Sequence, residues 1–262
     1  MQIWRAHYRD ALHDEDIDIM NTEGSYSTDP LSFTIDGVTF KGTSLTDLQP
    51  ADDTDLAKAC ERFCILKEGG FTIGKDDDPV PYWYTLQRYA MVVDIPITVV
   101  RKRDKSEAPA MLHISFEYKE HDPERIQGLC YCDDERVYQD DIYVYAFDLS
   151  VDGKVYSGET MTLCFESALM DISRKISADY YLKCCFTCQY SDYSPYGNDD
   201  FGIMQCFLRQ KENYLKVNSK IAYFTYLTDD WDSKQETQLC DKFEPRIRCD
   251  GYRGYVDGAF DM

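Results

Sequence analysis

Hydrophobic and polar residues alternate along much of the first 160 positions, and this period of two is typical of half-buried β-strands. Residues 1–8 read as an opening strand, and longer alternating runs cover residues 86–103 and 110–119. Val, Ile, Tyr and Thr dominate the longer runs, which favours strands over helices. Between the opening strand and the next one, the acidic segment 10–30 predicts an irregular connection across the surface.

Two predicted hairpins share the same turn. Alternating residues flank Asp36-Gly37 in the first and Asp152-Gly153 in the second, and Asp-Gly is the favoured pair for a two-residue turn with positive φ. A helix is expected after each hairpin. The first has approximate helical spacing from Leu56 to Leu66 and stops at Gly69-Gly70, and the second has helical spacing at Phe165, Leu169, Ile172 and Ile176. An internal duplication would explain the likeness, and so would chance, because Asp-Gly hairpins are common.

The pattern changes near residue 160. Long strand runs end, and cysteines, tyrosines and turn residues become frequent, with one short helix expected from Ser219, its N-cap, to Leu227. We therefore expect an α+β fold that is mostly antiparallel. Residues 1–160 would form an acidic, β-rich, sandwich-like domain, and residues 161–262 a cysteine-rich α/β region packed on it.

The charge is strongly acidic and unevenly placed. The chain has 28 basic and 48 acidic residues, a net charge of −20, and residues 1–160 hold 16 of the basic and 32 of the acidic ones. Such a surface repels phosphate backbones and anionic lipids, so we expect no direct nucleic-acid or membrane binding. An acidic surface suits a basic protein partner, although a role in solubility alone also explains the negative charge.

The cysteine content indicates a reducing compartment. Eleven cysteines occur without a secretory signal at the start of the chain, and the longest apolar stretch, 90–100, is interrupted by Asp94 and Pro96. In a reducing cytoplasm, thiols are metal ligands or buried hydrophobic groups. The pattern predicts a cytoplasmic protein and does not determine its oligomeric state.

One cysteine group has ligand spacing. Cys185-x-x-Cys188 can supply two zinc ligands from one turn, and 17 residues separate Cys188 from Cys206. The fourth ligand must come from Cys240 or Cys249, with Cys184 a neighbouring spare. Our preferred set is Cys185, Cys188, Cys206 and Cys240, holding a structural zinc ion. The alternatives are buried free thiols, or thiol-based redox chemistry in the segment Cys184 to Cys188.

No other chemistry is indicated. The four histidines pair with no particular cysteine, and phosphate-binding, dinucleotide-binding and hydrolase motifs are absent from the sequence. His113 is expected on a sheet face. The remaining cysteine pairs read as core or surface thiols, and the acidic clusters as solvated turns: Cys60 and Cys64, Cys130 and Cys132, 76–78, 133–135 and 140–141.

The cysteine-rich stretch resembles the signature of an uncharacterised bacterial family, a domain of unknown function. The residues that carry it are Cys185-x-x-Cys188 followed by Ser191-Asp192-Tyr193-Ser194-Pro195-Tyr196-Gly197, then Phe201-Gly202, Cys206, Cys240-x-x-Phe243-x-x-Arg246 and Gly251-Tyr252-Arg253-Gly254. The resemblance favours Cys240 over Cys249 as the fourth ligand and implies no activity.

The leading functional hypothesis is a non-enzymatic interaction protein that binds a basic protein partner. Small acidic cytoplasmic proteins are often antidotes to toxins, so an immunity-type protein is its most specific form. The competing hypotheses are a thiol-based enzyme or redox protein, and an acidic nucleic-acid mimic. The mimic would need ordered rows of carboxylates on one face.

Overall fold

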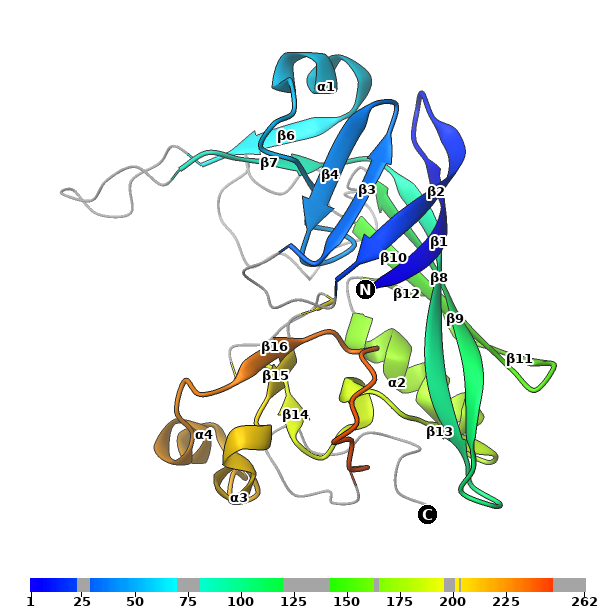
Figure 1. Cartoon of the computed structure of the whole chain (residues 1–262), viewed down its shortest axis with the longest axis vertical. Coiled ribbons are helices and arrows are strands. Elements are labelled where there is room, and N and C mark those ends of the chain that lie inside the picture. Colours follow the sequence, from blue (N-terminus) through cyan, green and yellow to red (C-terminus); the bar gives the residue numbers. More distant parts are fainter. Residues whose placement is uncertain are drawn as a thin grey trace, which may run out of the picture.

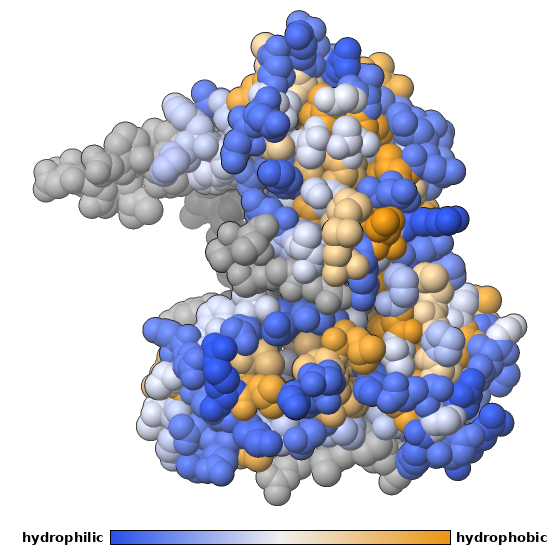
Figure 2. Space-filling model, viewed as in Figure 1, coloured by the Kyte–Doolittle hydropathy of each residue, from blue (hydrophilic) through white to orange (hydrophobic). Residues whose placement is uncertain are grey.

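The computed structural model describes residues 1–22, 29–69, 81–119, 142–162, 165–195, 201–202 and 204–246. These residues form an α+β structure dominated by antiparallel strands, so the predicted fold class is confirmed. Hydrophilic side chains cover much of the face shown in Figure 2, with smaller hydrophobic patches between them.

One eleven-stranded sheet organises the molecule (Figure 1). Its path runs β11 (Lys154–Ser157), β10 (Ile142–Val151), β9 (Glu107–Lys119), β8 (Ala90–Arg101), β1 (Gln2–Arg9), β2 (Asp14–Asn21), β3 (Leu31–Ile35), β4 (Val38–Gly42) and β5 (Gln49–Pro50). Two short strands join it from the side: β12 (Met161–Thr162) pairs with β10, and β13 (Tyr180–Leu182) pairs with β8.

The other elements lie around this sheet. A separate hairpin of β6 (Ile65–Glu68) and β7 (Trp83–Leu86) lies with α1 (Leu56–Arg62) at one end of the molecule (Figure 1). Helix α2 (Phe165–Ile176) packs on β10 and β11. The C-terminal region contains a small sheet and two short helices: β14 (Ser191–Asp192), β15 (Met204–Cys206), β16 (Asp232–Lys234), α3 (Lys211–Tyr214) and α4 (Lys220–Tyr226).

Local sequence explains the hairpins and two of the helices. Asp36 and Gly37 have φ of 45° and 74°, and Asp152 and Gly153 have 49° and 76°, the positive values that the two-residue turns require. Helix α2 buries its predicted apolar positions against the sheet. Ser219 caps α4 by accepting a hydrogen bond from the backbone N–H of Ala222, as predicted.

The expectation of an irregular segment over residues 10–30 was wrong. Residues 14–21 form β2, which pairs with the whole length of β1. Ile17 and Ile19 are buried, while Asp16 and Asp18, which alternate with them, are exposed. The alternation of apolar and polar residues was hard to recognise among so many acidic residues, because only one face of the strand needs apolar side chains.

The first predicted helix is shorter than expected. Helix α1 ends at Arg62, and Ile65 and Leu66 belong to β6, where they pair with Leu86 and Thr85. The apolar residues from Leu56 to Leu66 only approximate helical spacing, and pairing with β7 decides the conformation of the last part. The predicted stop at Gly70 lies outside the described residues.

Buried contacts attach the C-terminal region to the sheet. The ring of Trp4 on β1 meets that of Phe201 edge-on with centroids 5.9 Å apart. Asn21 on β2 and Gln235 exchange two amide hydrogen bonds, of 2.8 and 3.1 Å. The boundary near residue 160 stays a prediction, and α2 and β13, both beyond it, pack on and pair with strands of the first part.

No helix among the described residues is both long and apolar enough to cross a lipid bilayer.

Candidate metal centre

Three chain segments converge around the predicted zinc ligands. The first is a single turn of 3-10 helix, Cys185–Thr187, in which the backbone N–H of Cys188 donates to the carbonyl of Cys185 at 3.1 Å. This turn brings the two ends of the Cys-x-x-Cys motif together, as the spacing predicted. Cys185 and Cys188 are 5% and 8% exposed, so both thiols are removed from solvent.

The second segment is β15, which ends at Cys206. It pairs with β14, so that Cys206 lies opposite Ser191, three positions after Cys188. The backbone N–H of Phe207 extends this pairing by donating to the carbonyl of Tyr190 at 2.8 Å. The ladder therefore fixes Cys206 beside the turn that follows the motif.

The third segment contains Cys240. The backbone N–H of Cys185 donates to the carbonyl of Gln238 at 3.0 Å, and that of Gln189 donates to the carbonyl of Glu244 at 2.7 Å. Cys188 forms an isolated antiparallel bridge with Pro245. Cys240 thus lies in a segment that is hydrogen-bonded on both sides of the Cys-x-x-Cys motif.

A backbone hydrogen bond reaches one cysteine sulfur directly: the N–H of Lys242 donates to Sγ of Cys240 at 3.3 Å. Burial raises the pKa of Cys188 and of Cys206, and backbone hydrogen bonding opposes part of that rise, from Tyr190 and Glu244 at Cys188 and from Leu208 at Cys206. Such hydrogen bonds stabilise a thiolate, which is the form that binds zinc.

The thiols also act on one another. Burial raises the pKa of Cys185 well above its usual value, and the neighbouring thiols of Cys188, Cys184, Cys206 and Cys240 raise it further. Burial likewise raises the pKa of Cys188 and of Cys206, and Cys240 adds to both. We call Cys185, Cys188, Cys206 and Cys240 the four-cysteine cluster.

The cluster is not arranged as a finished coordination sphere. Over the described ranges, no group of three or more His, Cys, Asp or Glu side chains is positioned to hold a metal ion. The structure therefore brings the three segments into contact without closing their sulfurs around one point.

The other cysteines have different surroundings. Cys184 is buried, and desolvation raises its pKa to about 12, so its thiol is protonated at neutral pH. Cys60 on α1 and Cys64 after it are exposed. Cys130, Cys132, Cys164 and Cys249 lie outside the described residues, as do the predicted acidic clusters at 76–78, 133–135 and 140–141.

A buried polar chain beside the cluster was not predicted. Arg246 is fully buried and donates from Nη2 to the carbonyl of Ser191 at 2.5 Å and to the hydroxyl of Tyr214 at 2.9 Å. Tyr214 in turn donates to Oδ2 of Asp192 at 2.7 Å. Arg246 and Asp192 both belong to the signature quoted above, but the pattern gave no sign that a tyrosine would join them.

A second candidate site lies on the outward face of the large sheet. Nδ1 of His113 is 2.6 Å from a carboxylate oxygen of Asp94, and Nε2 is 2.9 Å from the hydroxyl of Ser150. These are the contacts of a Ser-His-Asp triad. Ser150, however, is paired on both sides, with Met111 and Val155, so its strand neighbours offer their N–H groups to the sheet rather than to an oxyanion. We interpret the contacts as a hydrogen-bonded row on the sheet surface.

A family model described as a family of unknown function (DUF6304) matches residues 2–191. The match includes Cys185 and Cys188, and it ends before Cys206 and Cys240. It therefore lies mostly on the part of the chain where no motif was recognised. No curated protein and no solved structure matches the chain.

Proposed function

We propose that this chain, which belongs to the family of unknown function DUF6304, is a non-enzymatic binding protein for a basic protein partner, held together at its C-terminal end by a structural zinc ion. We place it in the cytoplasm, where a reducing environment keeps its thiols available. An immunity-type antidote, which masks a basic toxin, is the most specific form of this proposal.

The zinc proposal is supported by one observation: backbone hydrogen bonds and strand pairing join three segments, far apart in sequence, that carry Cys185, Cys188, Cys206 and Cys240. Zinc is bound tetrahedrally by four thiolates at about 2.3 Å, which would bring the sulfurs to about 3.8 Å from one another. Four protein ligands leave no open position, so the role would be structural rather than catalytic. The ion would hold together a region whose described strands are only two or three residues long.

The reactive-thiol alternative has less support. A redox or nucleophilic cysteine needs an accessible thiol with a lowered pKa. Burial raises the pKa of Cys184, Cys185 and Cys188 instead, and each is less than a tenth exposed.

The nucleic-acid mimic also fits less well. Asp14, Asp16 and Asp18 do form an ordered row on β2, as a mimic would need. The neighbouring strand places Arg9, His7 and Arg5 directly opposite them, which interrupts the negative field.

Metal analysis of the purified protein tests the zinc proposal. We expect about one zinc per chain after purification under reducing conditions, and loss of the metal in Cys188→Ala and in Cys206→Ala. Cys60→Ala is the matched control, because its thiol is exposed on α1, and it should retain the metal. Metal-free protein whose melting temperature does not change when zinc is added would contradict the proposal.

Salt dependence tests the binding proposal. A basic partner captured at low ionic strength should be released as salt is raised, since screening shortens the reach of surface charges to about 8 Å at 0.15 M. A partner that remains bound in 1 M salt, or that carries net negative charge, would contradict a charge-driven interaction.

A further inference from the structure

The large sheet has one buried face and one outward face. We define the open face as the outward residues of five adjacent strands, within 144–150, 111–119, 90–96, 3–9 and 14–18. Along these strands the neighbours of the outward residues are buried, except for Glu15 on β2, and α2 and the C-terminal region cover that inner side. Within the described residues, no helix or strand packs over the open face.

The registers align the outward residues into rows that cross the strands. One row runs from Asp148 through His113, Asp94 and Arg5 to Asp18, each residue directly opposite the next. Strands lie about 4.8 Å apart, so the two carboxylates that end the row are separated by roughly 19 Å.

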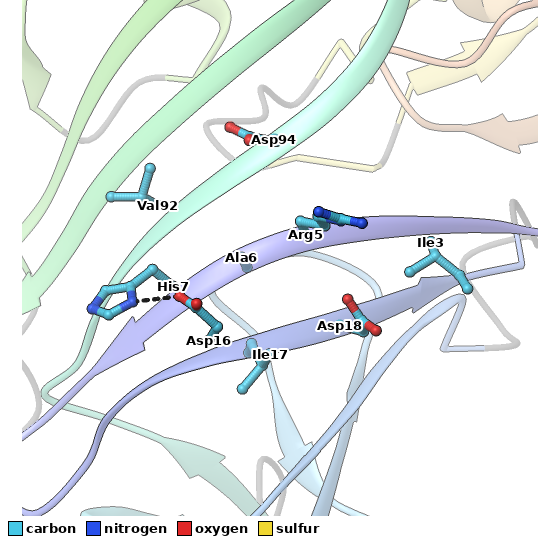
Figure 3. Close-up of a pocket in the computed structure, with 9 residues that line it drawn as sticks. All are labelled: Ile3, Arg5, Ala6, His7, Asp16, Ile17, Asp18, Val92 and Asp94. Atoms are coloured by element: carbon cyan, nitrogen blue, oxygen red, sulfur yellow. Dashed lines mark hydrogen bonds and ion pairs between the residues drawn. The ribbon is translucent and has the colours of Figure 1, made fainter.

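A hollow of about 840 Å³ lies at one side of this face. Figure 3 shows Arg5 between Asp94 and Asp18 along its wall, and His7 in contact with Asp16. Ile3 and Val92 also line it and are 53% and 44% exposed, so apolar surface is available beside the charges. Such a lining can take the apolar stem of a long cationic side chain whose charged end reaches a carboxylate.

The open face is acidic as a whole. It has six carboxylates against three permanent cations: Asp14, Asp16, Asp18, Asp94, Glu117 and Asp148 against Arg5, Arg9 and Lys119. Three of the six are already bonded to histidines, and Glu117 to Lys119. The carboxylates of Asp18 and Asp148, at the two ends of the row, form no hydrogen bond or ion pair within the part of the chain that the structure describes.

We propose that the open face is the surface that binds the basic protein partner, with cations of that partner meeting Asp18 and Asp148 and its aliphatic stems covering Ile3 and Val92. This inference rests on the proposed function and assigns it a location. Five strands of five to nine residues, seven on average, give a footprint of roughly 570 Å², which approaches the 800 Å² per partner of a stable protein interface. The size favours a folded protein or a helix over a small molecule.

A second copy of this chain fits the open face less well. Two copies meeting through it would bring two net negative surfaces together, which is unfavourable.

The probe for the test is a fluorescent, lysine-rich helical peptide of about 20 residues, which spans about 30 Å and can bridge both carboxylates. We expect Asp18→Lys/Asp148→Lys to weaken its binding at low salt at least tenfold. Glu61→Lys/Glu212→Lys makes the same change in net charge on exposed positions of α1 and α3, and it should weaken binding less than threefold.

A milder pair of variants controls for misfolding, which Asp18→Lys could cause by placing a lysine directly opposite Arg5. Asp18→Asn/Asp148→Asn should still weaken binding more than Glu61→Gln/Glu212→Gln does. Equal losses in both pairs would overturn the assignment of the surface and leave the proposed function standing. If the wild-type protein does not bind the peptide at low salt, the proposed function fails and the assignment with it. A dimer in sedimentation that Asp18→Lys/Asp148→Lys dissociates would instead make this face a contact between copies and contradict the proposal.

Discussion

Replacing Arg246 by methionine should destabilise the C-terminal region by about 3 kcal/mol. Methionine keeps much of the side-chain length but removes the cation that reaches the hydroxyl of Tyr214 and the carbonyl of Ser191. Asp192 is 1% exposed and would keep its hydrogen bond from Tyr214, but the buried cation that Tyr214 connects it to would be gone. Removing one partner of a buried charged network typically costs 3–5 kcal/mol.

The lower end of that range follows from the structure. Nε of Arg246 is buried and has no hydrogen-bond acceptor among the described residues, so part of the desolvation penalty is already present in the wild-type protein and is removed by the substitution. Since domains of ordinary size are stable by only 5–15 kcal/mol, a loss of about 3 kcal/mol is easily measured.

Urea unfolding followed by tryptophan fluorescence provides the assay. Trp231 packs against a buried hydrophobic cluster that includes Phe207 and Tyr214, and it therefore reports on this region. Arg209→Met is the control, because Arg209 is half exposed and pairs with Asp230 and Asp232 at the surface, where loss of such pairs costs at most about 1 kcal/mol.

A double variant completes the test. Arg246→Met/Asp192→Asn should lose less stability than the sum of its two single changes, since both disrupt one network. If Arg246→Met is no more destabilised than Arg209→Met, the buried chain contributes nothing to the fold and this reasoning is refuted.

Three further predictions concern the metal, one histidine and one glycine. Removal of the metal by a chelator should lower the melting temperature by roughly 5–10 °C, because a ligand at a hundred times its dissociation constant stabilises the folded state by about 2.7 kcal/mol. Added zinc should restore the melting temperature, and added magnesium should not. An unchanged melting temperature after chelation would argue against a structural ion. Hydrogen bonds from His7 to Asp16 and Asp14 raise the pKa of His7. The stabilising contribution of His7 is therefore complete below the unfolded-state pKa of about 6.5 and is lost as pH rises through the folded-state pKa. His7→Ala should lower the melting temperature more at pH 5.5 than at pH 8.5. An equal decrease at the two pH values would contradict the pairing of His7 with the aspartates. Gly158→Ala should cost about 1–3 kcal/mol in urea unfolding, because the added carbon would lie 2.6 Å from the carbonyl oxygen of Phe147; the exposed neighbour Ser157→Ala should be neutral, and similar values for the two would refute the close approach.

Elements specified by neighbouring residues could be read from the sequence. The Asp36-Gly37 and Asp152-Gly153 turns need positive φ, and Asp-Gly pairs adopt it at low cost. Helix α2 and its apolar stripe follow from spacing alone. Strand β2 was not predicted because its register depends on β1, and no residue within 14–21 identifies β1 as the strand it pairs with.

Only part of the candidate site could be predicted from the sequence. Spacing selected Cys185, Cys188 and Cys206, the family resemblance favoured Cys240 over Cys249, and the structure brings together the segments that carry these four cysteines. The tyrosine link between Arg246 and Asp192 joins residues separated by more than twenty positions, and no periodicity connects them.

The sequence by itself determined the strand-rich class, the Asp-Gly turns and the cap at Ser219, because each of these depends on the conformational preferences of a few adjacent residues. Only the tertiary structure decided which strands are neighbours, and hence that Asp148 and Asp18 end one row across five strands. Strand order and register are set by burying one whole face at once, a condition shared by residues far apart in the chain.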